Sequence, residues 1–221
     1  MDSSGRPGDA STAEVVDLTR HDLDDIARVH VAAFPESELT RLGHEAVRRS
    51  YLWQFDGPHD LVALGVRHHG RLEGFLFGGV FRGSTIGFVK RERWFLLGRV
   101  LRNPRMVVNA TSLSRITLAV RLLGRRRSGP PQSENPAAVP PRSFGVLSVA
   151  VDPATQGSGV GQLLMAEAEK RARSGEFVRM HLTVHPDNAR AVAFYERGGW
   201  SRIIADDGSW KGQMVLQLAD D

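Results

Sequence analysis

The sequence predicts an α/β fold in which helices flank a mixed sheet. Three observations predict it: a strand, a glycine-rich turn and a helix in succession over residues 144–175, a hairpin pattern over residues 61–81, and two strand-like segments over residues 201–218. At 221 residues the chain is long enough for one domain with a sizeable core. We therefore expect a single domain over residues 13–221, preceded by a small polar tail over residues 1–12 that we predict to be disordered.

The first elements alternate between strand and helix. Residues 14–18 read as a short strand, and the Thr19-x-x-Asp22 pattern is typical of a capped helix start. That helix should end before Pro35, because the residue preceding a proline disfavours the α region. A second helix is predicted over residues 39–53.

A hairpin and then an insertion follow. Two apolar runs, residues 61–68 and 72–81, are separated by His69 and Gly70, which favours a tight turn between paired strands. Residues 82–127 then insert a basic segment with two amphipathic helical pieces before the next strand, and residues 128–142 form a flexible, proline-rich loop.

The positive charge of the chain is concentrated in this insertion. Between Lys90 and Arg127 there are eleven basic residues and one acid, a local charge of +10, whereas the whole chain is +4. Three interpretations are open: a helical cover over a substrate cleft, a surface for an anionic substrate such as a nucleotide-linked sugar, and an interfacial helix that touches an anionic membrane. No recognised nucleic-acid-binding module is present, so we expect no nucleic acid partner.

The glycine-rich turn carries the clearest chemistry. Its six residues follow a buried strand and lead directly into a helix, and they are Gln156, Gly157, Ser158, Gly159, Val160 and Gly161. The first amides of a helix lack intrahelical partners and carry the positive end of the dipole, and glycines let a ligand approach the backbone closely. The sequence therefore predicts an anion site that suits a pyrophosphate.

The spacing of the turn excludes two common phosphate-binding motifs. A P-loop would need lysine after the last glycine, where this chain has Gln162, and a dinucleotide fingerprint would need its third glycine one position later. The turn instead resembles the Q/R-x-x-G-x-G/A signature of the GNAT N-acetyltransferases, with Gln156, Gly159 and Gly161 at the three fixed positions.

A second motif supports this resemblance. After a strand at residues 180–184, the chain resembles the N-x-x-A-x-x-F-Y-x-x-x-G-[FW] block of the same family, matched by Asn188, Ala191, Phe194, Tyr195, Gly199 and Trp200. The resemblance implies a GNAT fold, with a mostly antiparallel, twisted sheet of about seven strands and the basic helices as an insertion. Phe34 to Gly43 also looks like family members of sugar, polysaccharide or secondary-metabolite pathways.

The resemblance implies acetyl-CoA as co-substrate and assigns residues to it. The turn at Gln156–Gly161 would bind the pyrophosphate, and the strand residues Val149, Ala150 and Val151 would expose backbone groups to the pantetheine arm. The Val151 amide would stabilise the oxyanion. Asn188 would hold the pantetheine, cap its own helix, or do both. Tyr195 would protonate the departing thiolate, because a thiol leaves more readily when a proton donor is within reach.

The base that accepts the proton of the amine is less clear from the sequence. Many GNAT enzymes carry a glutamate in the strand that here covers residues 144–148, and this chain has none there. His185 and Glu36 are the candidates that we name first, with His30 and Ser148 as further ones. A water chain that ends at a backbone carbonyl is an alternative.

Composition restricts the remaining functions. The chain has no cysteine, which excludes a disulfide framework, a thiolate zinc site and an acyl-cysteine mechanism, and we expect no metal. The N-terminus lacks the apolar core of a signal peptide, and no uncharged apolar run approaches the roughly 18 residues of a membrane span. We expect a cytoplasmic protein that contacts membranes, if at all, through the surface of its basic insertion.

The function predicted from the sequence is acetyl transfer from acetyl-CoA to a primary amine of a small molecule, with an amino sugar as one example. A non-catalytic acyl-CoA-binding module and a protein or peptide N-acetyltransferase are the alternatives. The length of the acyl chain, the identity of the acceptor and the oligomeric state, with a homodimer among the options, are not specified by the sequence.

Overall fold

The structure is a computed structural model that describes residues 13–102 and 142–218. The predicted N-terminal tail, the second amphipathic piece of the insertion and the proline-rich loop up to residue 141 lie outside the described residues.

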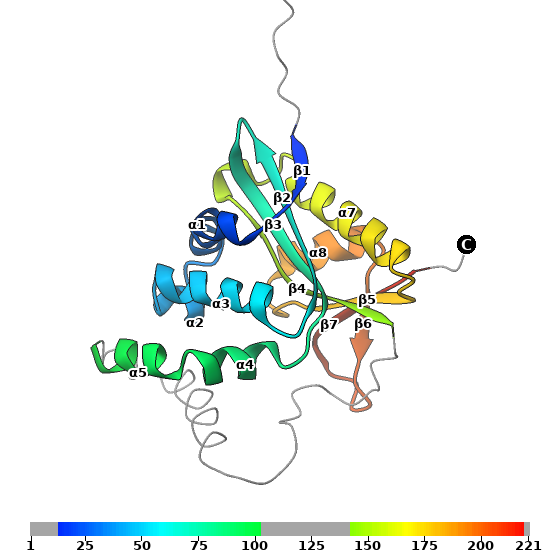
Figure 1. Ribbon diagram of the computed structural model, residues 1–221. Coiled ribbons are helices and arrows are strands. Elements are labelled where there is room, and N and C mark those ends of the chain that lie inside the picture. The colour runs from blue at the N-terminus through cyan, green and yellow to red at the C-terminus, as the bar shows by residue number, and fades with distance from the viewer. Residues whose placement is uncertain (1–12, 103–141, 219–221) are drawn as a thin grey trace, which may run out of the picture.

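A seven-stranded sheet forms the centre of the described part of the chain, with the strand order β1-β2-β3-β4-β5-β7-β6 (Figure 1). Only the β4–β5 pair is parallel among these strands. The predicted mixed, mostly antiparallel sheet with flanking helices is thus confirmed. The strands are β1 Glu14–Asp17, β2 Asp60–His68, β3 Arg71–Val80, β4 Ser143–Val151, β5 Arg179–Thr183, β6 Ser201–Ile204 and β7 Trp210–Gln217.

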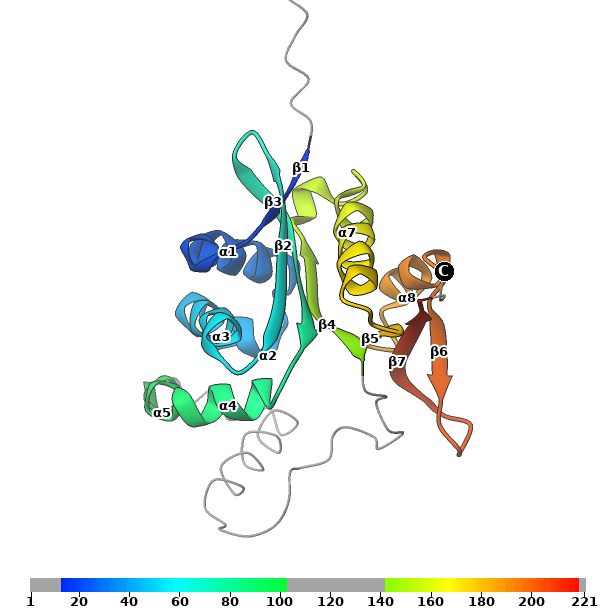
Figure 2. The same cartoon turned by 45° about the vertical axis from the view of Figure 1, so that its right-hand side comes forward.

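Helices cover both faces of this sheet. Figure 2 shows α1, α2 and α3 on one side and α7 and α8 on the other, with α4 and α5 beyond α3. We call these sides the α1 face and the α7 face. The helices are α1 Leu23–Ala33, α2 Glu38–Arg41, α3 His44–Asp56, α4 Ser84–Arg91, α5 Arg93–Arg102, α7 Val160–Ser174 and α8 Ala189–Arg197.

Local sequence explains most element boundaries. Thr19 accepts a hydrogen bond from the amide of His21, and the Asp22 carboxylate accepts one from the Thr19 amide, so the predicted capping pattern closes a 3₁₀ turn just before α1. His69 and Gly70 both have positive φ, as a two-residue hairpin turn between twisted strands requires.

The predicted single helix over residues 39–53 is wrong at one point. Gly43 has a φ of +96°, which a right-handed helix cannot contain, and the chain divides there into α2 and α3. The guanidinium of Arg99 lies where a side chain at position 43 would be, so the first described part of the insertion packs against this break.

Each face of the sheet has its own apolar core. The α7 face buries Leu64, Leu76 and Leu164, while the α1 face buries Ile26, Phe75 and Phe77. The division follows from the strand period of two, because Phe75 and Phe77 point one way and Leu76 points the other. Each fully buried side chain of this size contributes roughly 1.5–3 kcal/mol to folding.

Candidate active site

The sheet is split between β4 and β5. These two strands pair at only three positions, Ser143 to Gly145 against Arg179 to His181, and then diverge (Figure 2). Just past the pairing, Leu147 forms a bulge, because Ser148 pairs with Phe77 and Val146 already pairs with Gly78. Beyond the bulge, β4 keeps one edge on β3 and leaves the other edge open.

Backbone amides of β4 point into this opening. The amide of Asp152 donates to the carbonyl of Glu73 on β3 at 2.7 Å. Successive amides of a strand point to opposite edges, so the amides of Val151 and Val149 face away from β3, toward the diverging β5. Val149, Ala150 and Val151 are the residues predicted from the sequence to expose backbone groups here. The amide of Ala150 faces β3, so among these three it is the amides of Val149 and Val151 that face the opening.

The glycine-rich turn stands at the end of β4 and opens α7. Gly157 and Gly159 have φ values of +95° and +91°, a region that suits glycine and strains other residues. Across the described residues, no hydrogen bond occupies the amides of Gly157, Gly159, Val160, Gly161 and Gln162. The turn therefore presents a cluster of free donors at the positive end of the α7 dipole.

The start of α8 lies beside the turn. Asn188 caps α8, since its side-chain oxygen accepts from the amide of Ala191 at 3.1 Å. Arg190 donates to the side-chain oxygen of Gln156 at 2.9 Å, which connects the two motifs and brings a positive charge to the turn. The sequence analysis did not name Arg190. The feature of the sequence that could have identified it is a basic residue in the first turn of a helix, where the helix dipole disfavours positive charge.

Tyr195 lies on the same face, where its ring packs against Phe194 and Trp200 with centroid distances of 5.3 and 5.8 Å. Burial raises the pKa of the Tyr195 hydroxyl, so the group keeps its proton at neutral pH. A cavity of 320 Å³ borders this ring and is lined from α7 by Gln162 and Met165. The arrangement places a neutral proton donor between α7 and α8.

The α1 face contains a buried polar chain. Tyr51 on α3 lies 2.9 Å from Nδ1 of His30 on α1 and 3.1 Å from Oγ of Ser148 on β4, measured from its hydroxyl oxygen. His30 and Tyr51 are 7% and 4% exposed. The sequence analysis named His30 and Ser148 separately as candidate bases and did not name Tyr51, which joins them. The feature of the sequence that could have identified Tyr51 is a tyrosine on the apolar face of a predicted helix, one turn after Val47.

The two bases that the sequence placed first lie at the surface. The side chain of His185 is 75% exposed, with Nδ1 3.7 Å from the Asp187 carboxylate. The side chain of Glu36 is 86% exposed and forms an ion pair with Arg41 at 2.8 Å. Neither contacts the His30–Tyr51–Ser148 chain, although Glu36 directly precedes Ser37, which approaches His30.

Asp152 connects the two faces at the start of the turn. Its carboxylate accepts from the Ala154 amide and from the guanidinium groups of Arg71 and Arg28, at 3.1, 2.9 and 3.2 Å. The Ala154 hydrogen bond, followed by the two arginines, lowers the pKa of this carboxyl. Arg28 belongs to α1, so α1 holds the end of β4 and the turn in register.

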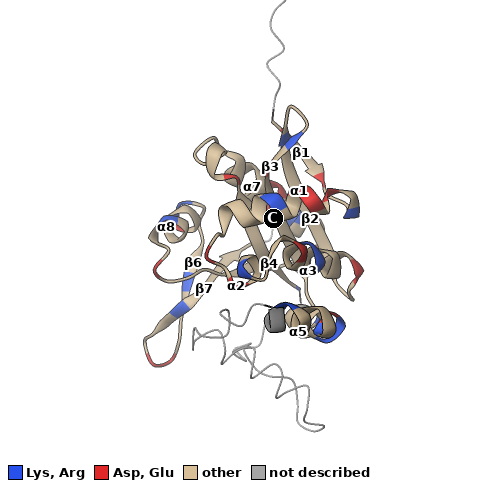
Figure 3. Cartoon of the chain, turned by 90° about the vertical axis from the view of Figure 1, so that its left-hand side faces the viewer, with Lys and Arg blue, Asp and Glu red and all other residues tan. Residues whose placement is uncertain are grey.

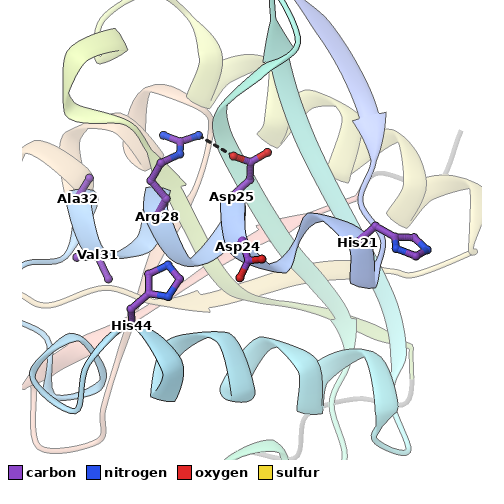
Figure 4. A pocket seen from close by; sticks show the side chains of 7 residues that line it. All are labelled: His21, Asp24, Asp25, Arg28, Val31, Ala32 and His44. Atoms are coloured by element: carbon purple, nitrogen blue, oxygen red, sulfur yellow. Dashed lines mark hydrogen bonds and ion pairs between the residues drawn. The ribbon is translucent and has the colours of Figure 1, made fainter.

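A broad hollow of 690 Å³ lies along α1 next to His44 (Figure 4). Its two carboxylates already hold arginines: Asp25 pairs with Arg28 at 3.2 Å, and Asp24 pairs with Arg48 at 3.0 Å. Because these charges are neutralised within the fold, we assign the hollow no chemistry.

The described part of the insertion, α4 and α5, lies beyond α3, and Figure 3 shows blue segments, Lys or Arg, on the α5 ribbon. Arg91 pairs with Asp56 and Glu92 pairs with Arg49, both at 2.8 Å. Trp94 is 73% exposed. These ion pairs hold the insertion beside the α1 face, and the three interpretations of its role stay open.

Residues 13–102 and 142–218 contain no cluster of three histidine, aspartate or glutamate side chains that could hold a metal ion. None of their helices is both long and apolar enough to cross a membrane.

The split parallel pair, the turn with free amides and the helix that follows it define the class of protein: a domain of the GNAT fold. Residues 127–200 match the family model described as the Acetyltransferase (GNAT) family. This stretch, about a third of the chain, is thus similar to the GNAT acetyltransferases.

A curated relative is similar over a short stretch of the chain. Over 64 residues, 29% of this chain, it is 39% identical to the N-alpha-acetyltransferase RimI of Mycobacterium tuberculosis and covers 39% of that protein. The chain spans less than half the length of the curated relatives that it matches.

Two solved structures have similar folds. The PaiA N-acetyltransferase of Thermoplasma acidophilum, solved in complex with coenzyme A, has a TM-score of 0.56 at 14% identity, with 94% of this chain and 99% of that chain covered. The ribosomal-protein-S18-alanine N-acetyltransferase of Escherichia coli has a TM-score of 0.55 at 14% identity, with 95% and 96% covered. At such identities the likeness establishes the fold alone.

Proposed function

We propose that this protein transfers an acetyl group from acetyl-CoA to a primary amine by direct attack in a ternary complex. One observation carries the proposal: β4 diverges from β5 after three pairs, and free backbone donors lie along its open edge and in the turn that follows it. Tyr195 on α8, whose hydroxyl is neutral, completes the set of groups that the proposal uses. Such an opening suits a ligand with an anionic end and a long, thin, polar arm.

The residues divide the ligand between them in this proposal. The turn at Gln156–Gly161 binds the pyrophosphate through its amides, with Arg190 adding positive charge. The pantetheine arm then lies along the open edge of β4 at Val149–Val151, where it forms strand-like hydrogen bonds. The side-chain oxygen of Asn188 caps α8 beside the arm. Its side-chain NH₂ group is left to donate to the arm.

The chemistry follows from where charge develops. The amine attacks the thioester carbonyl, and the negative charge that forms on the carbonyl oxygen is stabilised by the Val151 amide, which is fixed in advance by the sheet. Collapse of the tetrahedral intermediate expels the thiolate of coenzyme A, and Tyr195 protonates it. The candidates for the base that takes the proton from the amine are His185 and Glu36, with His30 and Ser148 as further ones.

We propose a small-molecule amine, with an amino sugar as one example, as the acceptor. The α-amine of a protein N-terminus is the second candidate, and the similarity of 64 residues to an N-alpha-acetyltransferase favours it. The chemistry at the thioester is the same for both acceptors. In this proposal the choice between them is therefore made elsewhere, by residues of the α1 face and of the insertion.

Thiol release tests the proposal. The purified chain is incubated with acetyl-CoA and with each member of two panels, one of small amines that includes amino sugars and one of peptides with free N-termini. We expect release of free thiol that depends on one of the panels and is reduced in His185→Ala or Glu36→Gln if either residue is the base. Tight binding of acetyl-CoA, measured by calorimetry, without turnover on any amine would instead support a non-catalytic acyl-CoA-binding module.

A further inference from the structure

A line of hydrogen-bonded groups runs from the split in the sheet to the surface. It begins at Ser148 on β4, passes through the hydroxyl of Tyr51 and the ring of His30, and continues from Nε2 of His30 to Oγ of Ser37 at 3.4 Å. Ser37 is half-buried at the start of α2, where its hydroxyl also donates to Oγ1 of Thr40 at 2.9 Å. No part of the acetyl-CoA site described above uses this line.

The polarity of the line can be derived from its outer end. The single hydroxyl proton of Ser37 goes to Thr40, and the Thr40 amide donates to the same oxygen at 3.1 Å. Toward His30, Ser37 can therefore only accept, so the proton of a neutral imidazole is on Nε2. Nδ1 then accepts from the hydroxyl of Tyr51, and Tyr51 in turn accepts from Ser148. Every donor points away from β4, which leaves the lone pairs of Ser148 Oγ free to accept a proton.

Ser148 occupies a place where an attacking amine could reach it. It follows the Leu147 bulge, a few residues beyond the last β4–β5 pair. Its side chain points to the α1 face, as its contact with Tyr51 shows, whereas the open amides of Val149 and Val151 border the split. Ser148 directly precedes Val149, so in the proposed complex an amine that attacks from the α1 face would approach its hydroxyl.

We infer that Ser148, Tyr51 and His30 form a proton relay in which Ser148 accepts the proton of the attacking amine and the other two conduct it toward Ser37. This inference rests on the proposed acetyl transfer. It assigns the α1 face a chemical task, and it places the base function in a buried line instead of in a single carboxylate.

The protons and charges of the step balance. When the amine attacks, its nitrogen becomes positive while the carbonyl oxygen becomes negative. The nitrogen gives one proton to Ser148 Oγ as Ser148 passes its own to Tyr51 and Tyr51 passes its own to Nδ1 of His30. The imidazolium releases its Nε2 proton through Ser37 to water. The thiolate takes a proton from Tyr195, which is replenished from water, so the products are the amide and the free thiol.

Burial suits His30 to conduct a proton without storing it. It lowers the pKa of His30 to about 4, so the ring is neutral at pH 7 with one nitrogen free to accept. An imidazolium formed in this place would lose its proton rapidly. The same burial raises the pKa of Tyr51, whose hydroxyl therefore stays protonated between transfers.

The test compares single hydroxyl deletions in the full chain, with thiol release at saturating acetyl-CoA. For Ser148→Ala and Tyr51→Phe we expect kcat to fall about 10²-fold, the size of a general-base contribution, while the Kd of acetyl-CoA stays within twofold. Ser148→Thr keeps the hydroxyl on a strand and should restore most of kcat. Ser50→Ala, next to Tyr51 but outside the line, is the matched control and should behave as wild type.

Two further measurements separate a relay from a structural role. In mixtures of H₂O and D₂O, kcat of the wild type should fall along a curve, because several protons move together, and Tyr51→Phe should give a straight line or no effect. The double variant Ser148→Ala/Tyr51→Phe should be no slower than either single variant, because one break already interrupts the line.

The failures of the two proposals can be told apart. Turnover that stays within twofold in both single variants, or that falls only together with the melting temperature, overturns the relay and leaves acetyl transfer standing. A wild-type chain that binds acetyl-CoA and acetylates no amine overturns the proposed function, and the relay with it.

Discussion

The two faces of the sheet present different kinds of polar group, which come from different parts of the chain. The α7 face presents backbone: the amides of the turn and of β4, held by sheet and helix geometry. The α1 face presents side chains: Ser148, Tyr51 and His30, which come from three distant segments. The chain has two tyrosines in total, and each face holds one of them. The comparison suggests that the α7 face handles the acyl donor and the α1 face handles the proton of the acceptor.

The largest effect that would separate the faces is expected for Tyr195→Phe. Removing this hydroxyl should lower kcat about 10²- to 10³-fold, because the thiolate must then leave without a proton donor. Steady-state thiol release checks kcat, and calorimetry should show an unchanged Kd for acetyl-CoA. The deficit should shrink with an acetyl thioester whose thiol has a lower pKa. If it does not, Tyr195 has a role other than protonating the leaving group.

The α1 face should carry a characteristic pH dependence of stability. His30 has its pKa lowered from 6.5 to about 4 by burial, so it takes up a proton more readily in the unfolded chain. The free energy of unfolding is therefore unaffected by this group above pH 6.5. It falls by about 3 kcal/mol in total as the pH is lowered from 6.5 toward 4.

Urea unfolding between pH 7 and pH 4 checks this prediction. His30→Gln can still accept from Tyr51 but does not titrate, so its stability should fall less steeply than that of the wild type over this interval. Parallel curves for the two proteins would show that His30 is protonated equally in the folded and unfolded chains.

On the α7 face, Gly159→Val should weaken acetyl-CoA binding by about 10-fold or more. A β-branched residue at a φ of +91° costs about 1–3 kcal/mol of strain, and the turn can relieve it only by moving its amides. Gly161→Ala is the matched control, since its new methyl group would meet Phe194 at an ordinary 3.5 Å. Calorimetry measures both, and equal affinities for the two variants would argue against pyrophosphate binding at this turn.

At the link between the faces we expect a change in stability that is smaller than the one at His30. Asp152→Asn replaces a carboxylate whose pKa is lowered by the Ala154 amide and by Arg71 and Arg28, and should cost about 2 kcal/mol at pH 7. Because the folded pKa lies below the usual 3.8, this stabilisation is present above pH 4 and is lost as the pH falls further. Thermal unfolding at pH 7 and pH 3 should show a larger difference between Asp152→Asn and the wild type at the higher pH.

Sequence reasoning reached the α7 face more completely than the α1 face, for a physical reason. The turn from Gln156 to Gly161 and the block that contains Asn188 and Tyr195 are each short, so fixed spacing along one strand or helix already determines which groups lie on the same side. Local rules failed where a glycine interrupts a periodic pattern, as Gly43 does between α2 and α3.

The relay could not be predicted from the spacing of residues along the chain. Ser148 and Tyr51 are 97 residues apart in the chain, and they meet because the ring of Tyr51 packs on Phe77, the β3 residue that pairs with Ser148. His30 reaches Tyr51 only because α1 and α3 lie side by side. The histidine and the serine could be named as candidates because each residue type can move protons, but nothing in the sequence pairs them.

The sequence by itself determined the fold class, the strand–turn–helix unit and the residues proposed to hold acetyl-CoA, because these depend on backbone conformation over short stretches. The tertiary structure alone decided which side chains line the opposite face, how far His185 and Glu36 lie from it, and that Tyr51 connects two groups that are separate in the chain. The physical reason is that hydrogen bonds between side chains form over about 3 Å, and only the packing of helices on a sheet brings distant segments within that range.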